Sequence, residues 1–122
     1  MHHTPTIAIV DDDDGVRTSL ASLIRSLGYE ARCYGSALDF LAAGESTDPD
    51  CMIADIQMPH MTGDQLQAEL IASGRIFPMI FMTAFPNEAT RARVMAAGAI
   101  DFLDKPADSD AIAICLAAAV GE

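Results

Sequence analysis

The residues of this chain best suited to chemistry are aspartates and one lysine that follow short apolar stretches. The run Asp11–Asp14, the single Asp55 and Lys105 each stand just after a stretch that is typical of a buried strand. In an open sheet of parallel strands, the carboxyl ends of the strands line one crevice, and ligands bind there. The pattern therefore predicts at least three acids and one lysine at a single sheet edge. Because gathered acids repel one another, such a site favours a divalent cation.

Strands and helices alternate along the sequence in the pattern of an α/β protein. Hydrophobic spacing, capping residues and glycine stops indicate where each element lies. The predicted strands are 6–10, 30–34, 51–55, 78–83 and 100–103, and the predicted helices are 14–27, 36–43, 62–73, 87–97 and 109–120. Continuous apolar strands predict a doubly wound five-stranded parallel sheet covered on both faces, as in flavodoxin-like folds. The second strand is the most polar, which suits a sheet edge and the order 2-1-3-4-5.

Composition narrows the class of protein further. The 122 residues predict one domain over 1–122, with residues 1–5 as a flexible leader. The formal net charge of −11 would repel a nucleic-acid backbone, so direct contact with nucleic acid is not expected. No apolar stretch is long enough to span a membrane. Three scattered cysteines, Cys33, Cys51 and Cys115, predict buried, reduced thiols and a cytoplasmic protein.

Four motifs, each after its own predicted strand, resemble the receiver domain of two-component response regulators. They are Ile-Val-Asp-Asp-Asp at 9–13, Asp-Ile-Gln-Met-Pro-His-Met-Thr-Gly at 55–63, Met-Thr-Ala at 82–84 and Gly-Ala-Ile-Asp-Phe-Leu-Asp-Lys-Pro at 98–106. The resemblance covers the chain from Ile7 to Val120. It implies a phosphoacceptor domain that takes a phosphoryl group from a sensor histidine kinase or a histidine phosphotransfer protein.

The resemblance assigns a role to each residue of the site. Asp55 is expected to be the phosphoacceptor, and the expected Mg²⁺ ligands are Asp11, Asp12, Asp55 and the backbone carbonyl of Gln57. Magnesium suits such a site because it prefers hard oxygen ligands and is usually held by carboxylates together with phosphate. Thr83 would donate a hydrogen bond to the phosphoryl group. Lys105 would pair with that group, or with Asp55 before transfer. A cis peptide bond between Lys105 and Pro106 is implied as well, and it would point the lysine ammonium into the crevice.

The resemblance also implies a switch. Thr83 would move toward the phosphate and Phe102 would turn inward, which would alter the face made by the fourth helix, the fifth strand and the fifth helix. That face could then control an output domain or partner, or form a phosphorylation-dependent homodimer. The protein would not be an enzyme beyond transfer to its own aspartate and slow loss of the phosphate. The remaining acids of the first run, Asp13 and Asp14, are expected only to begin the first helix.

Two positions depart from the usual family pattern. Ala107 follows Lys105-Pro106, where a bulky aromatic is common, so looser packing is expected beneath that loop. Phe85, with Gln57, flanks the expected path of the water that removes the phosphate. A large apolar side chain there predicts a long-lived phosphorylated state.

Two other classes of function remain open at the level of sequence. The stretch 7–16 also resembles the first motif of haloacid-dehalogenase-like phosphatases, with Asp12 as nucleophile and Asp14 as general acid. That interpretation leaves Asp55 without a role. The other alternative is a phosphate-independent protein-interaction module. A calcium loop is excluded, because the spacing from Gly15 would require an acid where Val10 stands.

Overall fold

The computed structural model describes residues 3–121 as alternating strands and helices. The strands are β1 (Thr6–Val10), β2 (Glu30–Tyr34), β3 (Cys51–Asp55), β4 (Met79–Thr83) and β5 (Asp101–Asp104). The helices are α1 (Asp14–Ser26), α2 (Ala37–Ala42), α3 (Gly63–Ala72), α4 (Glu88–Ala96) and α5 (Ser109–Val120), with a short 3-10 helix η1 (Glu45–Thr47) before β3.

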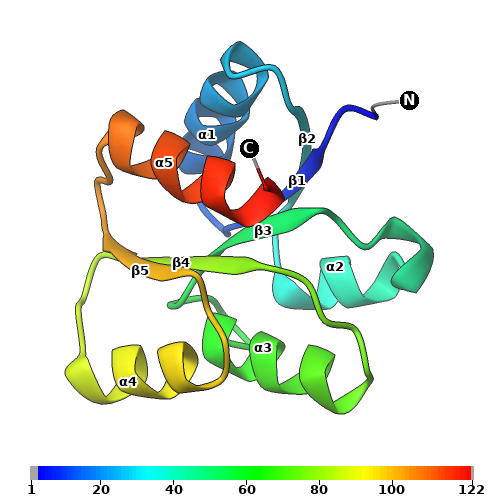
Figure 1. Ribbon diagram of the computed structural model, residues 1–122. Helices are drawn as coiled ribbons and strands as arrows, with labels where there is room; N and C mark the ends of the chain where they lie inside the picture. Colours follow the sequence, from blue (N-terminus) through cyan, green and yellow to red (C-terminus); the bar gives the residue numbers. More distant parts are fainter. Residues whose placement is uncertain (1–2, 122) are drawn as a thin grey trace.

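All strand pairs are parallel, and the order in the sheet is β2-β1-β3-β4-β5. Helices α1 and α5 cover one face of the sheet, and α2, α3 and α4 cover the other (Figure 1). The predicted fold class and strand order are therefore confirmed. In this order β1 and β3 are neighbours, and the helices that follow them, α1 and α3, lie on opposite faces of the sheet (Figure 1). Ligands of open α/β sheets bind outside the carboxyl ends of two such strands.

The alternation of side chains along each strand builds a core on both faces of the sheet. On β1, Ile7 and Ile9 pack on the α1/α5 side, whereas Ala8 and Val10 pack on the α2–α4 side. A strand that is apolar at every position must be covered on both faces, which is why the central strands read as unbroken apolar runs. This two-sided burial fixes the strands whose ends carry the functional residues.

Side-chain caps fix where several helices begin. The Asp13 carboxylate accepts a hydrogen bond from the Val16 N–H at 3.0 Å and caps α1. Thr62 and Gln65 form the predicted capping box at the start of α3. These caps hold the loops after β1 and β3 in place, and both loops carry site residues.

The structure departs from the sequence predictions in small ways. Most element ends are confirmed or shift by one residue; β5, for example, begins and ends one residue later than predicted. The prediction that all three cysteines are buried is wrong for Cys33, which is exposed because it lies on the edge strand β2. In the predicted leader, His3 Nε2 lies 3.2 Å from Asp50 Oδ2, and the Pro5 carbonyl accepts a hydrogen bond from Glu30. Residues 1–2 lie outside the described part of the chain.

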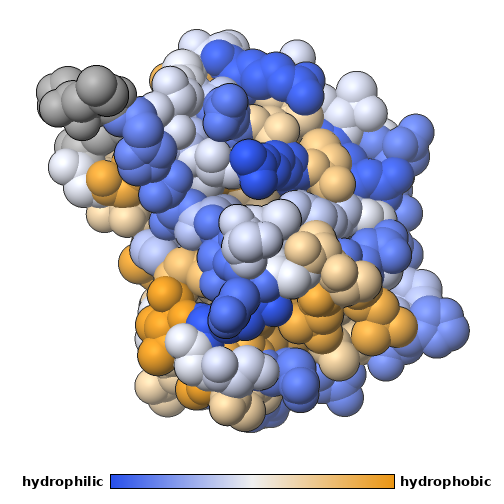
Figure 2. Space-filling model, turned by 90° about the vertical axis from the view of Figure 1, so that its right-hand side faces the viewer, coloured by the Kyte–Doolittle hydropathy of each residue, from blue (hydrophilic) through white to orange (hydrophobic). Residues whose placement is uncertain are grey.

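The surface mixes polar and apolar residues. Figure 2 shows the side on which the strands begin, where hydrophilic residues in blue alternate with separate orange patches. Within residues 3–121, no helix has both the length and the apolar character needed to cross a membrane.

The start of α3 approaches the end of β3 so closely that only glycine fits there. A Cβ added at Gly63 would collide with the backbone carbonyl oxygen of Asp55. We expect Gly63→Ala to lower the free energy of unfolding by about 1 to 3 kcal/mol, measured by urea denaturation. The control is Gly35→Ala, whose Cβ would meet Arg17 Nη1 at an ordinary 3.6 Å. Equal stability of the two variants would contradict this account of Gly63.

Candidate functional site: an acidic crevice with one lysine

The three predicted acids meet at the carboxyl ends of β1 and β3. Asp11 follows β1, and its N–H continues the pairing with β2 by donating to the Tyr34 carbonyl at 3.2 Å. Asp55 is the last residue of β3. One carboxylate oxygen from each of Asp11, Asp12 and Asp55 lies within 4.8 Å of the others. Asp11 and Asp55 are only 2% and 5% exposed, whereas Asp12 faces solvent.

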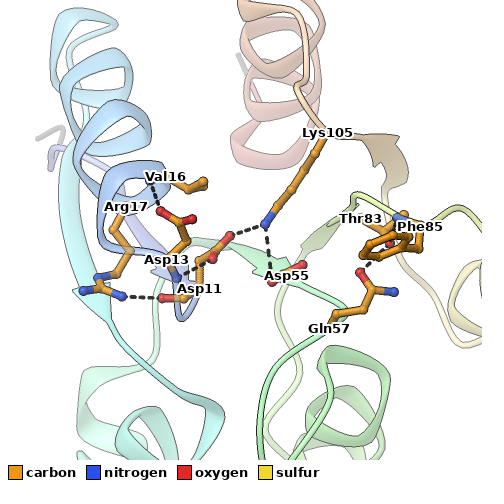
Figure 3. A network of polar contacts seen from close by, with 9 residues as sticks. All are labelled: Asp11, Asp13, Val16, Arg17, Asp55, Gln57, Thr83, Phe85 and Lys105. Carbon is orange, nitrogen blue, oxygen red and sulfur yellow. Dashed lines mark hydrogen bonds and ion pairs between the residues drawn. The ribbon is translucent and has the colours of Figure 1, made fainter.

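Lys105 reaches this cluster from the end of β5. Its N–H donates to the Thr83 carbonyl at 2.8 Å, which continues the pairing of β5 with β4. Its ammonium lies 2.7 Å from Asp11 Oδ2 and 3.3 Å from Asp55 Oδ2, and Figure 3 shows it pointing between the two carboxylates. The predicted cis peptide bond between Lys105 and Pro106 is present. Lys105 therefore forms an ion pair with Asp55, and its role in phosphoryl transfer stays a prediction.

The two carboxylate oxygens of Asp55 have different surroundings. Oδ2 contacts Lys105, but Oδ1 is buried and has no hydrogen-bond partner among residues 3–121. Burial, and then the charge of Asp11, raise the pKa of Asp55 to about 6, although Lys105 and the backbone N–H of Gln57 oppose the shift. Burial alone would lower the pKa of Lys105, but the hydrogen bond and charge of Asp11 and the charge of Asp55 outweigh it and raise that pKa.

Arg17 and Asp13 support Asp11, a role that the sequence reasoning missed. The Asp13 N–H donates to Asp11 Oδ1 at 2.9 Å, so each oxygen of the Asp11 carboxylate has a partner. Arg17, on the first turns of α1, donates to the backbone carbonyl of Asp11 at 2.7 Å and pairs with Asp14 at 2.9 Å. The three-residue spacing of Asp14 and Arg17, which allows an ion pair on a helix, can be read from the sequence. The contact of Arg17 with the Asp11 backbone depends on how the loop folds.

The second half of the site lies between the ends of β3 and β4. Thr83 is fully buried, and its hydroxyl donates to Gln57 Oε1 at 2.6 Å. The same hydroxyl oxygen accepts a hydrogen bond from the Phe85 N–H at 3.0 Å. Sequence reasoning placed Thr83 and the Gln57 backbone in the site but missed this contact of the Gln57 side chain.

The comparisons with known proteins agree with this geometry. The sequence pattern of the response regulator receiver domain family matches residues 7–117. This chain belongs to that family. It is 39% identical over 115 residues to the transcriptional regulatory protein FixJ of Azorhizobium caulinodans, covering 94% of this chain and 54% of FixJ. The response regulator protein TmoT of Ectopseudomonas mendocina is 39% identical over 82% of this chain and 46% of its own length.

Solved structures give the same answer for the fold. The crystal structure of FixJ-N has a TM-score of 0.88 and 30% sequence identity, and covers 100% of this chain and 97% of its own. The structure of response regulator StyR has a TM-score of 0.90 and 35% identity, covering 98% of this chain and 60% of its own. The receiver domain described here thus spans about half the length of the curated relatives that it matches.

The donor set of the receiver domain fits Mg²⁺. Asp11, Asp12 and Asp55 offer hard carboxylate oxygens from one small region. Magnesium is typically held by a few such oxygens together with phosphate and water. The part assigned to the Gln57 carbonyl stays a prediction.

The structure bears on three further expectations drawn from the family. The Phe102 ring is already buried, with 8% exposure, in the core on the α2–α4 side, so no inward turn is needed to bury it. Its switch role stays a prediction. Beside Ala107, a cleft of about 590 Å³ opens between α1 and the β5–α5 loop, in agreement with the expected loose packing; Val16, Leu20 and Ile112 line its apolar wall. The Phe85 ring is 71% exposed, and its effect on phosphate lifetime stays a prediction.

The raised pKa of Asp55 predicts a pH-dependent stability in the metal-free protein. Because the folded state holds this proton more tightly than the unfolded chain does, the stabilising contribution is full below about pH 4 and is lost as the pH rises through about 6. Without metal at about pH 8, Asp55→Asn should raise the free energy of unfolding by about 2 to 3 kcal/mol. The gain should vanish near pH 4. Urea denaturation with a chelator present measures both values.

A suitable control for the change of charge is Glu69→Gln, on the exposed part of α3. This variant should show a small effect at either pH. A stability gain for Asp55→Asn that is the same at about pH 4 and pH 8 would contradict the assigned cause.

Proposed function

We propose that this receiver domain accepts a phosphoryl group on Asp55 from a phosphohistidine of a sensor histidine kinase or a histidine phosphotransfer protein. The observation that carries the proposal is the asymmetry of the Asp55 carboxylate. Lys105 contacts Oδ2, while the buried Oδ1 has no hydrogen-bond partner in the part of the chain that the structure describes. A carboxylate held by one oxygen and free at the other is oriented for attack by the free oxygen.

The transfer step follows from this arrangement. Asp55 Oδ1 forms a bond to phosphorus, and the phosphorus–nitrogen bond of the phosphohistidine breaks. The imidazole nitrogen keeps that electron pair and takes up a proton. Phosphoryl transfer requires in-line positioning and charge stabilisation more than covalent help from the protein, and the Lys105 ammonium supplies positive charge beside Asp55. The domain promotes transfer to its own side chain and slow hydrolysis, so it is not an enzyme that turns over a substrate.

The expected metal ligands are Asp11, Asp12, Asp55 and the backbone carbonyl of Gln57. Mg²⁺ bound there supplies positive charge that neutralises the phosphoryl oxygens. The three carboxylates contribute the binding charge, and Lys105 keeps two of them in place.

Phosphorylation would then act on the rest of the domain. The phosphoryl group adds about −1.5 to −2 charges and three strong acceptors close to Thr83. We infer a switch through Thr83 and Phe102 to the α4–β5–α5 face, which would contact an output domain, a partner or a second phosphorylated copy. Some relatives are named transcriptional regulators. The net charge of −11 supports regulation of such an output without direct nucleic-acid contact by this domain, and a cytoplasmic location fits that role.

The phosphatase alternative is disfavoured by where its two acids lie. The Asp14 side chain is 91% exposed and is paired with Arg17 at 2.9 Å, on the solvent side of α1. A general acid must face the bound substrate, whereas this carboxylate faces solvent and forms an ion pair with an arginine. Among the described residues, the buried carboxylate oxygen that lacks a hydrogen-bond partner belongs to Asp55.

The proposal is tested with a small acyl-phosphate donor such as acetyl phosphate. Intact mass spectrometry measures the result. We expect the wild-type protein to gain the mass of one phosphoryl group in the presence of Mg²⁺ and to gain no mass when a chelator is present. Asp55→Asn should lose the gain in mass, and the control Asp14→Asn should keep it. If Asp55→Asn is still modified while Asp12→Asn is not, the phosphatase interpretation is supported. If the wild-type protein gains no phosphate, the domain is a phosphate-independent interaction module.

A further inference from the structure

The Thr83 hydroxyl is engaged in two hydrogen bonds. It lies at the end of β4 with 0% exposure, donates to Gln57 Oε1 at 2.6 Å and accepts from the Phe85 N–H at 3.0 Å. A hydroxyl has one proton to donate. That proton is therefore committed to Gln57 until something replaces the amide.

Gln57 is placed to connect the phosphoacceptor with Thr83. It follows Asp55 by two residues, and its backbone N–H is close enough to lower the pKa of Asp55 in part. Its side chain turns away from the Asp11, Lys105 and Asp55 pairs and points toward Thr83, as Figure 3 shows. Gln57 thus has its backbone beside Asp55, while its side-chain amide accepts a hydrogen bond from the Thr83 hydroxyl at the end of β4.

A phosphoryl group on Asp55 would compete with Gln57 for the same proton. Its oxygens carry negative charge, and hydrogen bonds to a charged acceptor are about twice as strong as neutral ones. We propose that Gln57 is a positioning residue that holds Thr83 in the unphosphorylated arrangement, so that phosphorylation must break the Thr83–Gln57 hydrogen bond before Thr83 can donate to the phosphate. This inference rests on the proposed phosphoacceptor function.

The consequence is a resting state that Gln57 stabilises. Because the bond exists only in the unphosphorylated arrangement, its free energy opposes the switch and keeps the unphosphorylated domain in its resting form. Gln57 itself is exposed, so its replacement should leave the core intact. Because the amide carbonyl carries no charge, its hydrogen bond with Thr83 is weaker than one to a charged phosphoryl oxygen.

The test replaces the acceptor and keeps the shape. Gln57→Met has nearly the same length but no amide oxygen. Beryllofluoride, a mimic of the phosphoryl group, is titrated into the protein with Mg²⁺ by isothermal calorimetry. We expect Gln57→Met to bind it roughly 2- to 10-fold more tightly than wild type, because a neutral hydrogen bond no longer has to be broken. Unchanged or weaker binding would overturn the inference.

A double-mutant cycle gives the matched control. Thr83→Val removes the hydroxyl and keeps the branched shape, so Gln57→Met should change the affinity by less than about 2-fold in that background. An equal gain in both backgrounds would mean that the effect does not pass through the hydroxyl, and would overturn the inference. If the wild-type protein itself shows no magnesium-dependent binding, the proposed function fails with it; if wild type binds and the cycle shows no coupling, only the role of Gln57 fails.

A second measurement needs no ligand. The Thr83 hydroxyl proton should exchange with water more slowly in wild type than in Gln57→Met, as followed by NMR, because only the wild-type protein provides its acceptor. Equal exchange rates would contradict the hydrogen bond on which the inference depends.

Discussion

The attraction between Lys105 and two buried carboxylates is the interaction on which the rest of the site depends. Three aspartates with oxygens within 4.8 Å of one another repel, and two of the three are almost fully buried. Lys105 offsets part of that repulsion at 2.7 Å from Asp11 and 3.3 Å from Asp55. The remaining excess of negative charge favours a cation.

The parallel sheet brings these charged side chains together. Parallel strands end at the same edge, so Asp11, Asp55 and Lys105 arrive from three different strands at one crevice. Backbone pairing continues beyond each strand and fixes where the next residue points. Gly63 lets α3 begin directly against the Asp55 carbonyl. The stability of the sheet is therefore what holds like charges at short distance.

Much of this could be predicted from the sequence because it depends on local pattern. Apolar runs defined the strands, and the polar β2 indicated the sheet edge; acids after strand ends indicated the crevice. Other features depend on contacts between distant residues. The pairing of the Gln57 amide with Thr83 joins residues 26 positions apart and requires a particular side-chain rotamer. The exposure of Cys33 depends on which face of an edge strand is left uncovered, and composition does not reveal that.

The most direct test of the account identifies the phosphorylated residue itself. After reaction with acetyl phosphate and Mg²⁺, borohydride reduces an aspartyl phosphate to homoserine, and peptide mass spectrometry then locates the change. The account predicts homoserine at position 55 alone. Homoserine at position 12, with Asp55 unchanged, would contradict it and would move the chemistry to the end of β1.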